Sequence, residues 1–291
     1  STQSTGQFEP ILKKLVDYKL KEVLAQTNFS TTILAEHKKS KQQHVIKLCD
    51  TTKVLPHTKQ LVLQEALILK QLDHPNVIKC IDSLIINEVA VVITEFANFG
   101  DLEAQILQAD QCRGTPKERG FLNLIMINSL LGQIARGLQY IHSQNIIHRD
   151  LKPSNILLMK DPQSQKVVAK IADFGISKLL REGPVTNTVI GTELYTAPEV
   201  FQKIPYNNKC DMWSLGLILH EMMTLTHAME KVNMFKLHET PLIQFIGLKS
   251  EELEEICKKL IQFRAESRID AIEVLKYPYL KRVMEKVDLM K

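Results

Sequence analysis

The chain has 291 residues, of which 44% are hydrophobic and 24% charged, as expected of a globular protein with a sizeable core. The formal net charge of +4 is small for this length and argues neither for nor against a nucleic-acid partner, which usually requires a much stronger basic bias; we expect no such partner. No apolar run reaches transmembrane length, so we expect no membrane partner either. A cytoplasmic protein is the default expectation, with a nuclear location left open.

The cysteines favour a reducing compartment. There are five of them, an odd number; they are far apart, and no two form a C-x-x-C pair. This pattern indicates isolated thiols rather than a disulfide framework or a zinc site.

The first half of the chain has β character. Residues 1–7 are small and polar and are predicted to be disordered. Residues 31–34 and 44–48 flank a lysine-rich turn and predict a hairpin. A helix is predicted over 59–72, where apolar residues recur at spacings of three and four, and residues 89–93 predict a buried strand.

The second half is dominated by helical periodicity. A long amphipathic helix is predicted over 121–143, after a polar segment at 108–120 that resembles a surface insertion. From residue 205 onward the pattern is almost wholly helical. A small β-rich half therefore precedes a larger α-rich half, with the crossover near 95–100.

Three motifs carry the strongest functional signal. Residues 148–155 read HRDLKPSN, residues 173–175 read DFG, and residues 197–199 read APE. In this order they resemble the signature of the eukaryotic protein kinase family, over roughly residues 18 to 282. Lys152 together with Thr192 resembles the serine/threonine class in particular.

This resemblance implies an α+β, bilobal protein kinase fold. It implies a small β-rich N-lobe with one main helix and a larger α-helical C-lobe. We expect a partly disordered N-terminal extension at 1–17, the N-lobe and hinge at 18–97, and the C-lobe at 98–291.

The resemblance also implies which residues transfer a phosphoryl group from ATP. Asp150 would accept the proton of the substrate hydroxyl, and Lys152 would reach the transferred group. Asn155 and Asp173 would hold Mg²⁺, which prefers hard oxygen ligands.

A lysine and a glutamate complete the predicted catalytic set. Lys47 matches the lysine of the third strand, and Glu65 matches the glutamate of the following helix. An ion pair between them would hold Lys47 against the nucleotide phosphates. Without the downstream motifs, Lys47 would be interpreted as an ordinary strand-end lysine and Glu65 as a solvated helix residue.

The nucleotide site is assigned by the same resemblance. Thr94 would be a small gatekeeper, and Asp101 would reach the ribose. The implied nucleotide-binding residues are Leu24, Ala25, Thr27, Thr32, Val45, Lys47, Thr94, Glu95, Ala97, Asp101, Leu157 and Asp173. For Thr32, Val45 and Leu157, plain core packing would be about as good an interpretation on its own.

The loop that covers the phosphates departs from the family pattern. Ala25, Thr27 and Ser30 stand where the family has the glycines of G-x-G-x-x-G. Glycine is used there because it allows close backbone approach and unusual dihedral angles. We therefore expect a poorer lid and weaker ATP binding than in a glycine-rich relative.

Regulation is expected in the segment between the second and third motifs. Its threonines are Thr186, Thr188 and Thr192. Thr188 ranks first as an activating phosphorylation site, with Arg149 as the receptor for the phosphate and an upstream kinase as the partner that adds it. Thr192 is expected to be structural, and an unmodified loop is the alternative for the other two.

Two hypotheses about the function remain open. The first is an active kinase acting on serine or threonine of protein substrates. The second is a pseudokinase, a nucleotide-binding or scaffolding module, which the altered glycine loop favours. A small-molecule kinase fits less well because a full segment up to the third motif is present. Within the family, the chain shows faint likeness to NIMA-related and to calmodulin-dependent kinases.

Overall fold

The computed structural model of the chain describes residues 8–52, 56–112, 122–174, 192–229, 239–241, 243–245 and 248–289. These residues form two compact units. The sheet unit contains 8–52, 56–74, 78–97 and Phe174, and the helical unit contains 75–77, 98–112, 122–173 and the described residues from 192 onward. A smaller β-rich unit and a larger α-helical unit agree with the α+β, bilobal fold that was predicted.

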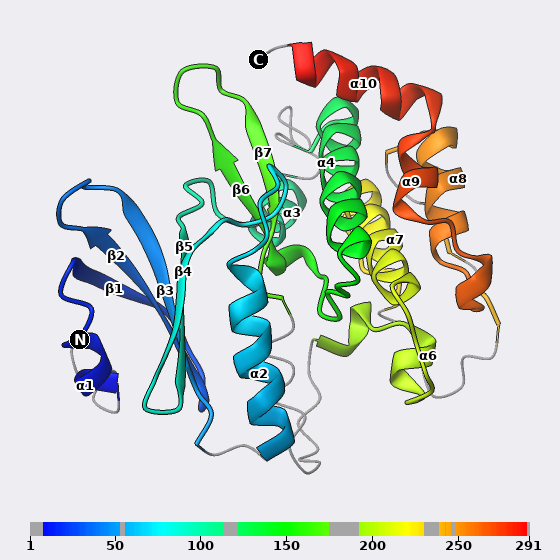
Figure 1. Cartoon of the computed structure of the whole chain (residues 1–291). Helices are drawn as coiled ribbons and strands as arrows, with labels where there is room; N and C mark the ends of the chain where they lie inside the picture. Colours follow the sequence, from blue (N-terminus) through cyan, green and yellow to red (C-terminus); the bar gives the residue numbers. More distant parts are fainter. Residues whose placement is uncertain are drawn as a thin grey trace. The chain divides into compact units, whose positions relative to one another are not determined.

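The sheet unit is a five-stranded antiparallel sheet with two helices (Figure 1). Its strands are β1 (Tyr18–Gln26), β2 (Ser30–His37), β3 (Gln43–Asp50), β4 (Cys80–Ile86) and β5 (Val89–Glu95), in the spatial order β1-β2-β3-β5-β4. The helices are α1 (Glu9–Leu12) and α2 (Pro56–Leu69). The predicted hairpin is the β2–β3 pair, the predicted buried strand is β5, and the predicted helix is α2, which begins and ends three residues earlier than expected.

Side chains alternate between the two faces of this sheet and build a separate apolar cluster on each. The α2 cluster contains Cys49, Val62, Ala66, Cys80, Ala90 and Val92. Lys70 Nζ, 2.7 Å from Asp82 Oδ1, ties the end of α2 to β4.

The opposite face is covered by the segment around α1. Phe8, Ile11 and Leu15 are buried there against β2, β3 and β5. This α1 cluster comprises Phe8, Ile11, Leu15, Ile33, Ala35, Ile46, Leu48, Val89, Val91 and Ile93. Residues 8–15 thus belong to the core of the sheet unit, whereas residues 1–7, predicted to be disordered, lie outside the described residues.

Three rings lie at one end of the α1-covered face. His44 is buried, with ring centroids 5.8 Å from Tyr18 and 6.2 Å from His37. Burial, and then the charge of His37, lower the pKa of His44. The folded state therefore takes up a proton less readily than the unfolded chain, so stability is fully present above the ordinary histidine pKa and declines below it.

Replacing His44 by phenylalanine tests whether protonation of His44 lowers the stability at acidic pH. The His44→Phe variant keeps a ring in the contact but cannot take up a proton. Urea unfolding should show that wild type loses more stability than the variant between about pH 7.5 and about pH 5.5. Equal losses for the two proteins would show that His44 does not contribute to the acid sensitivity.

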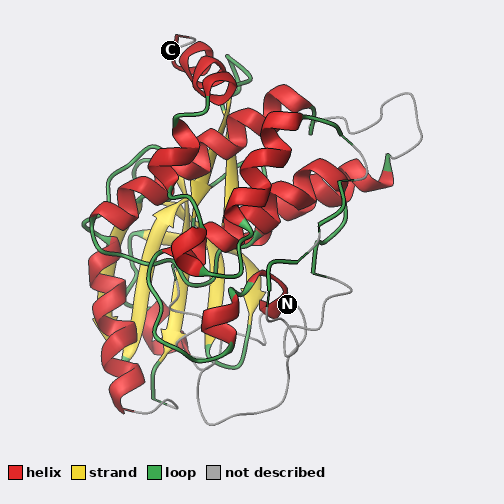
Figure 2. Cartoon of the chain, turned by 90° about the vertical axis from the view of Figure 1, so that its right-hand side faces the viewer, coloured by secondary structure: helices red, strands yellow, loops and turns green. Residues whose placement is uncertain are grey.

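The helical unit contains the remaining described elements; Figure 2 shows the helices of the whole chain in red and its strands in yellow. They are α3 (Leu102–Gln111), α4 (Leu124–Ser143), η2 (Pro153–Asn155), β6 (Ile156–Lys160), β7 (Val167–Ile171), η3 (Thr192–Tyr195), α6 (Pro198–Phe201), α7 (Lys209–Thr224), α8 (Glu251–Leu260), η5 (Ala265–Ser267), α9 (Ala271–Leu275) and α10 (Pro278–Leu289). The long helix predicted over 121–143 is α4, which begins after Asn123, whose side chain accepts from Met126 N.

Helix α7 is the centre of this unit. Nearly all its residues are buried, including Trp213, which is fully inaccessible to solvent. A Cβ on Gly216 would lie 2.6 Å from Ile261 Cγ1 and 2.8 Å from Leu260 Cβ, so only glycine lets α8 approach this closely.

The thiols behave as predicted from their spacing. None of the five cysteines forms a disulfide; Cys112 is half-buried and the other four, Cys49, Cys80, Cys210 and Cys257, are buried. Burial raises the pKa of Cys80 to about 11 and raises that of Cys257 further. Among the described residues, no helix is long and apolar enough to cross a membrane.

Candidate active site

The loop between α4 and β6 brings together two predicted catalytic side chains, Asp150 and Lys152, and one predicted metal ligand, Asn155. Lys152 Nζ lies 3.4 Å from Asp150 Oδ2. Asn155 Nδ2 donates to the backbone oxygen of Asp150 at 2.7 Å and approaches its Oδ2 at 3.3 Å. Asp150 and Asn155 are both buried. The amide of Asn155 therefore fixes the carboxylate of Asp150, and the amide oxygen is the atom of that group able to bind a metal ion.

Helix α7 anchors this loop through one buried carboxylate. Asp211 accepts hydrogen bonds from the backbone N–H of His148 at 2.8 Å and of Arg149 at 2.9 Å. It also lies 2.8 Å from Nε2 of His142, at the end of α4. Burial by itself raises the pKa of Asp211, but the contact with His142 and the neighbouring donors hold it below its ordinary value. The contact with His142 was not found from the sequence.

The predicted metal ligands lie side by side in the backbone. Ala172 N donates to Asn155 O at 2.9 Å, and His148 Nε2 is 2.9 Å from Ala172 O. These bonds hold the residue after Ala172, the exposed Asp173, next to Asn155. A carboxylate and an amide oxygen at neighbouring positions are donors that fit Mg²⁺.

Two residues of this region have a left-handed backbone although neither is glycine. Arg149 has φ of 68° and Asp173 has φ of 59°. Such conformations cost about 1–3 kcal/mol each and persist where the surroundings enforce them, typically at functional sites. The bonds from Asp211 and Asn155 to the adjoining backbone are the enforcing contacts here.

Asp101 and Leu157 are also brought together in the helical unit. They form an isolated antiparallel bridge. Asp101 Oδ1 accepts from Ala104 N at 2.8 Å and so caps α3. Its predicted contact with a ribose would come in addition to this capping role.

The sheet unit aligns the other half of the predicted site. Thr32 and Val92 lie directly opposite Lys47 on the two neighbouring strands, and Thr94 lies opposite Val45. The pleat places Lys47 on the face of the sheet that α2 covers, because Cys49, two residues further along β3, belongs to the α2 cluster.

Ala25 continues this row as the partner of Thr32, while Leu24 is 44% exposed. At the end of β5, Glu95 Oε1 accepts from Lys79 N at 2.8 Å, and Ala97 is buried. Glu65 lies within α2, but its side chain is outside the described part of the chain, so the Lys47–Glu65 ion pair stays a prediction.

Only the end of the predicted regulatory segment is described. Thr186 and Thr188 lie outside the described residues, and Thr192 is the first residue of η3. Tyr195, the last residue of η3, donates from its hydroxyl to Glu221 Oε2 of α7 at 2.5 Å, and its backbone oxygen accepts from Ser214 Oγ at 2.8 Å. Burial raises the pKa of Glu221.

The ring of Tyr195 packs edge-on against His227 at 4.6 Å between centroids. The contacts of Tyr195 with Ser214, Glu221 and His227 were not predicted from the sequence. The residues of η3 and α7 that form these contacts are 19 to 26 positions apart, and no local pattern relates them.

A buried ion pair joins the third motif to the segment before α9. Both terminal nitrogens of Arg268 bind the carboxylate of Glu199, at 2.5 and 2.8 Å. Arg268 also donates to backbone oxygens of Gln262, Phe263 and Lys209. The structure thus pairs Glu199 of the third motif with an arginine 69 residues further along the chain.

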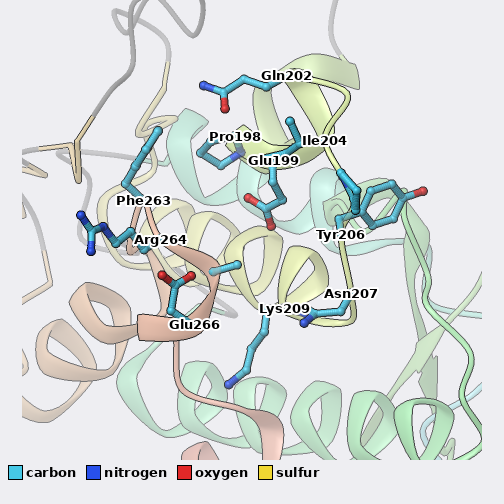
Figure 3. A pocket seen from close by; sticks show the side chains of 12 residues that line it. Pro198, Glu199, Gln202, Ile204, Tyr206, Asn207, Lys209, Phe263, Arg264 and Glu266 are labelled. Atoms are coloured by element: carbon cyan, nitrogen blue, oxygen red, sulfur yellow. The ribbon is translucent and has the colours of Figure 1, made fainter.

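A pocket of about 830 Å³ lies beside this ion pair (Figure 3). Glu199 is at its centre, with Ile204 and Tyr206 on one side and Phe263 and Arg264 on the other. None of the predicted catalytic or nucleotide-binding residues lines it.

The comparisons with known proteins identify the class. The family model "Protein kinase domain" matches residues 18–280, and the chain therefore belongs to the protein kinase domain family.

Several curated relatives are serine/threonine-protein kinases. The chain is 32% identical to "Serine/threonine-protein kinase Nek5" from Homo sapiens, over 92% of the chain and 37% of that protein. It is 33% identical to "Probable serine/threonine-protein kinase nek1" from Dictyostelium discoideum, over 92% of the chain and 57% of that protein.

A third relative, "Myosin light chain kinase A" from Dictyostelium discoideum, is 32% identical over 91% of the chain and 88% of that protein. The chain thus spans less than two thirds of the length of the two Nek proteins. The predicted resemblance to the serine/threonine class and to NIMA-related kinases is confirmed.

Proposed function

We propose that this chain transfers the γ-phosphoryl group of ATP to serine or threonine hydroxyls of protein substrates. The observation that carries the proposal is the cluster of the buried Asp150 and Asn155 with the half-buried Lys152, joined to Asp173 through the bond between Ala172 and Asn155. The names of the relatives support the same class of reaction.

Each polar residue of the cluster has a separate role in this proposal. Asp150 accepts the proton of the substrate hydroxyl as that oxygen attacks. Lys152 holds the transferred phosphoryl group through its positive charge. Asn155 and Asp173 supply oxygens to Mg²⁺, which when bound neutralises phosphate charge.

In the sheet unit, Lys47 binds the nucleotide phosphates and Glu65 orients Lys47. Thr94, Glu95 and Ala97 bind the adenine, and Asp101 of the helical unit binds the ribose. Val45 and Leu157 contact the two faces of the base. The register that aligns Lys47 with Thr32 and Val45 with Thr94 supports this assignment.

Phosphorylation of Thr188 by an upstream kinase or by the chain itself is the proposed means of regulation. A phosphothreonine brings nearly two negative charges, for which Arg149 is the receptor. A cytoplasmic location, with a nuclear one left open, goes with this proposal.

The second candidate is a pseudokinase that binds nucleotide or partners without transfer. The observation that favours it is the phosphate loop, in which Ala25, Thr27 and Ser30 replace glycines. The presence of Lys47 and of the complete cluster around Asp150 favours the active enzyme.

Replacing Asp150 by asparagine separates the two candidates. We expect wild type to transfer labelled γ-phosphate from Mg·ATP to a generic protein substrate and to itself. Asp150→Asn should lose about 10²–10⁴-fold in kcat because the proton acceptor is gone. The measurement is incorporation of label, with modified residues mapped by mass spectrometry.

The matched control is Asp161→Asn, which changes the same group in the exposed turn between β6 and β7. It should keep wild-type activity. Label on serine and threonine in wild type and in this control, and not in Asp150→Asn, supports the kinase. Absence of transfer by wild type, even with Thr188 phosphorylated, would instead favour the pseudokinase.

A further inference from the structure

The turn that joins β1 to β2 is closed by the side chain of Thr27. Its hydroxyl oxygen accepts a hydrogen bond from the backbone N–H of Ser30 at 3.0 Å and a longer one from that of Phe29 at 3.3 Å. It also lies 2.9 Å from Ser30 Oγ. The backbone N–H of Thr27 in turn donates to Ser30 O at 2.8 Å.

A second set of contacts holds the tip of the same turn. The ring of Phe29 is partly buried against the α2 cluster, which contains Val62 and Ala66 of α2. The backbone oxygen of Phe29 accepts from Asp50 N at 2.8 Å. The turn is therefore held by the hydrogen bonds of Thr27 and by the contacts of Phe29 with the sheet unit.

The N–H groups of such a turn are the donors that a phosphate would use. Successive backbone N–H groups in a tight turn form an anion-binding concavity, and in protein kinases this loop covers the nucleotide phosphates. Here the N–H groups of Phe29 and Ser30 are directed at an oxygen of the protein itself.

We propose that the hydroxyl of Thr27 acts as an internal substitute for a phosphate oxygen, so that the nucleotide must displace it to be gripped by this loop. The proposal rests on the nucleotide site of the proposed function and deepens it. In this proposal the hydroxyl of Thr27 lowers the affinity for the nucleotide phosphates. This effect is separate from the loss of backbone flexibility that follows from having no glycine at the same position.

The two explanations predict different ATP affinities for variants of Thr27. If the missing glycine alone weakens binding, Thr27→Val will behave as wild type, because valine has the same shape and is also branched at Cβ. If the hydroxyl competes with phosphate, Thr27→Val will release both N–H groups, whereas Thr27→Ser will keep the competitor. Water can bind the released groups in the absence of nucleotide, because the Phe29 bond is exposed and the Ser30 bond only partly buried.

The experiment is equilibrium binding by calorimetry of adenosine, ADP and ATP with Mg²⁺ to wild type, Thr27→Val and Thr27→Ser. We expect Thr27→Val to bind ATP about fivefold more tightly, because the phosphates no longer have to replace the hydrogen bonds of the Thr27 hydroxyl. The expected gain in binding free energy corresponds to roughly one neutral hydrogen bond. Adenosine, which has no phosphate, should bind all three proteins equally. Thr27→Ser should match wild type for all ligands.

Other outcomes overturn the proposal in distinguishable ways. Equal or weaker ATP binding by Thr27→Val would show that the hydroxyl does not compete, and would leave the kinase assignment untouched. Equal tightening for adenosine and ATP would also overturn it, because the effect would not involve phosphate. If wild type and both variants bound no ATP at all, the nucleotide site itself would be wrong, and the proposed function would fall with it.

Discussion

Replacing Arg268 by methionine should lower the free energy of unfolding by about 3–5 kcal/mol. The guanidinium is fully buried and binds Glu199 through two nitrogens, so its removal leaves a buried carboxylate without its cation. It also removes donors from the backbone oxygens of Gln262 and Lys209. Urea unfolding followed by circular dichroism measures the change.

The control for this variant is Arg282→Met on α10. Arg282 is exposed and lies over the ring of Tyr279 at 5.8 Å, so its loss should change stability by about 0.5 kcal/mol or less. The double variant Glu199→Gln with Arg268→Met should be more stable than Arg268→Met alone, because the unpaired charge is removed. A loss below about 1 kcal/mol for Arg268→Met would contradict a structural role for the buried pair.

Replacing Phe8 by alanine should destabilise the sheet unit by about 3–5 kcal/mol. Phe8 is 1% exposed and packs in the α1 cluster, on the face of the sheet opposite α2. Its truncation leaves a cavity over β2, β3 and β5 that the short helix α1 cannot fill by moving. Thermal unfolding at fixed protein concentration should show the loss as a lower midpoint.

The comparison for Phe8 is Val16→Ala, which truncates another apolar side chain in the same segment. Val16 is 64% exposed, so its midpoint should stay close to that of wild type. Equal midpoints for Phe8→Ala and Val16→Ala would mean that the segment before β1 adds little to the stability of the sheet unit.

The contrast between local and distant contacts explains which parts could be predicted. The loop at 148–155 is contiguous, so its motif predicts the cluster of Asp150, Lys152 and Asn155 directly. The β2–β3 hairpin and the long helix α4 follow from period-two and period-3.6 patterns over a few turns. Contacts of this range are encoded in neighbouring residues.

Contacts between distant residues are not encoded in neighbouring positions. Glu199 and Arg268 are 69 residues apart, and no local pattern pairs them. His142 and Asp211 are equally distant in sequence, and no stated motif joined them, so the histidine was overlooked. A carboxylate buried in a helix requires partners, but its position in the sequence does not say which ones.

The α1 segment and the Thr27 turn were missed for different reasons. Helix α1 has four residues, too few for an amphipathic period, and its burial depends on an apolar sheet face built from later strands. Thr27 was interpreted as a nucleotide-loop residue that replaces a glycine, and its hydroxyl was given no role. The signal that could have identified its role is a hydroxyl two and three residues before backbone N–H groups of a turn, which is a common side-chain-to-backbone pattern.

The four buried cysteines can report which part of the folded structure opens. Cys49 and Cys80 lie in the sheet unit, and Cys210 and Cys257 lie in the helical unit. A thiol reagent should label the half-buried Cys112 first, while the other four react only when the surrounding structure opens. Peptide mapping of the label over time would therefore show which unit opens first, and whether Phe8→Ala loosens one unit and Arg268→Met the other.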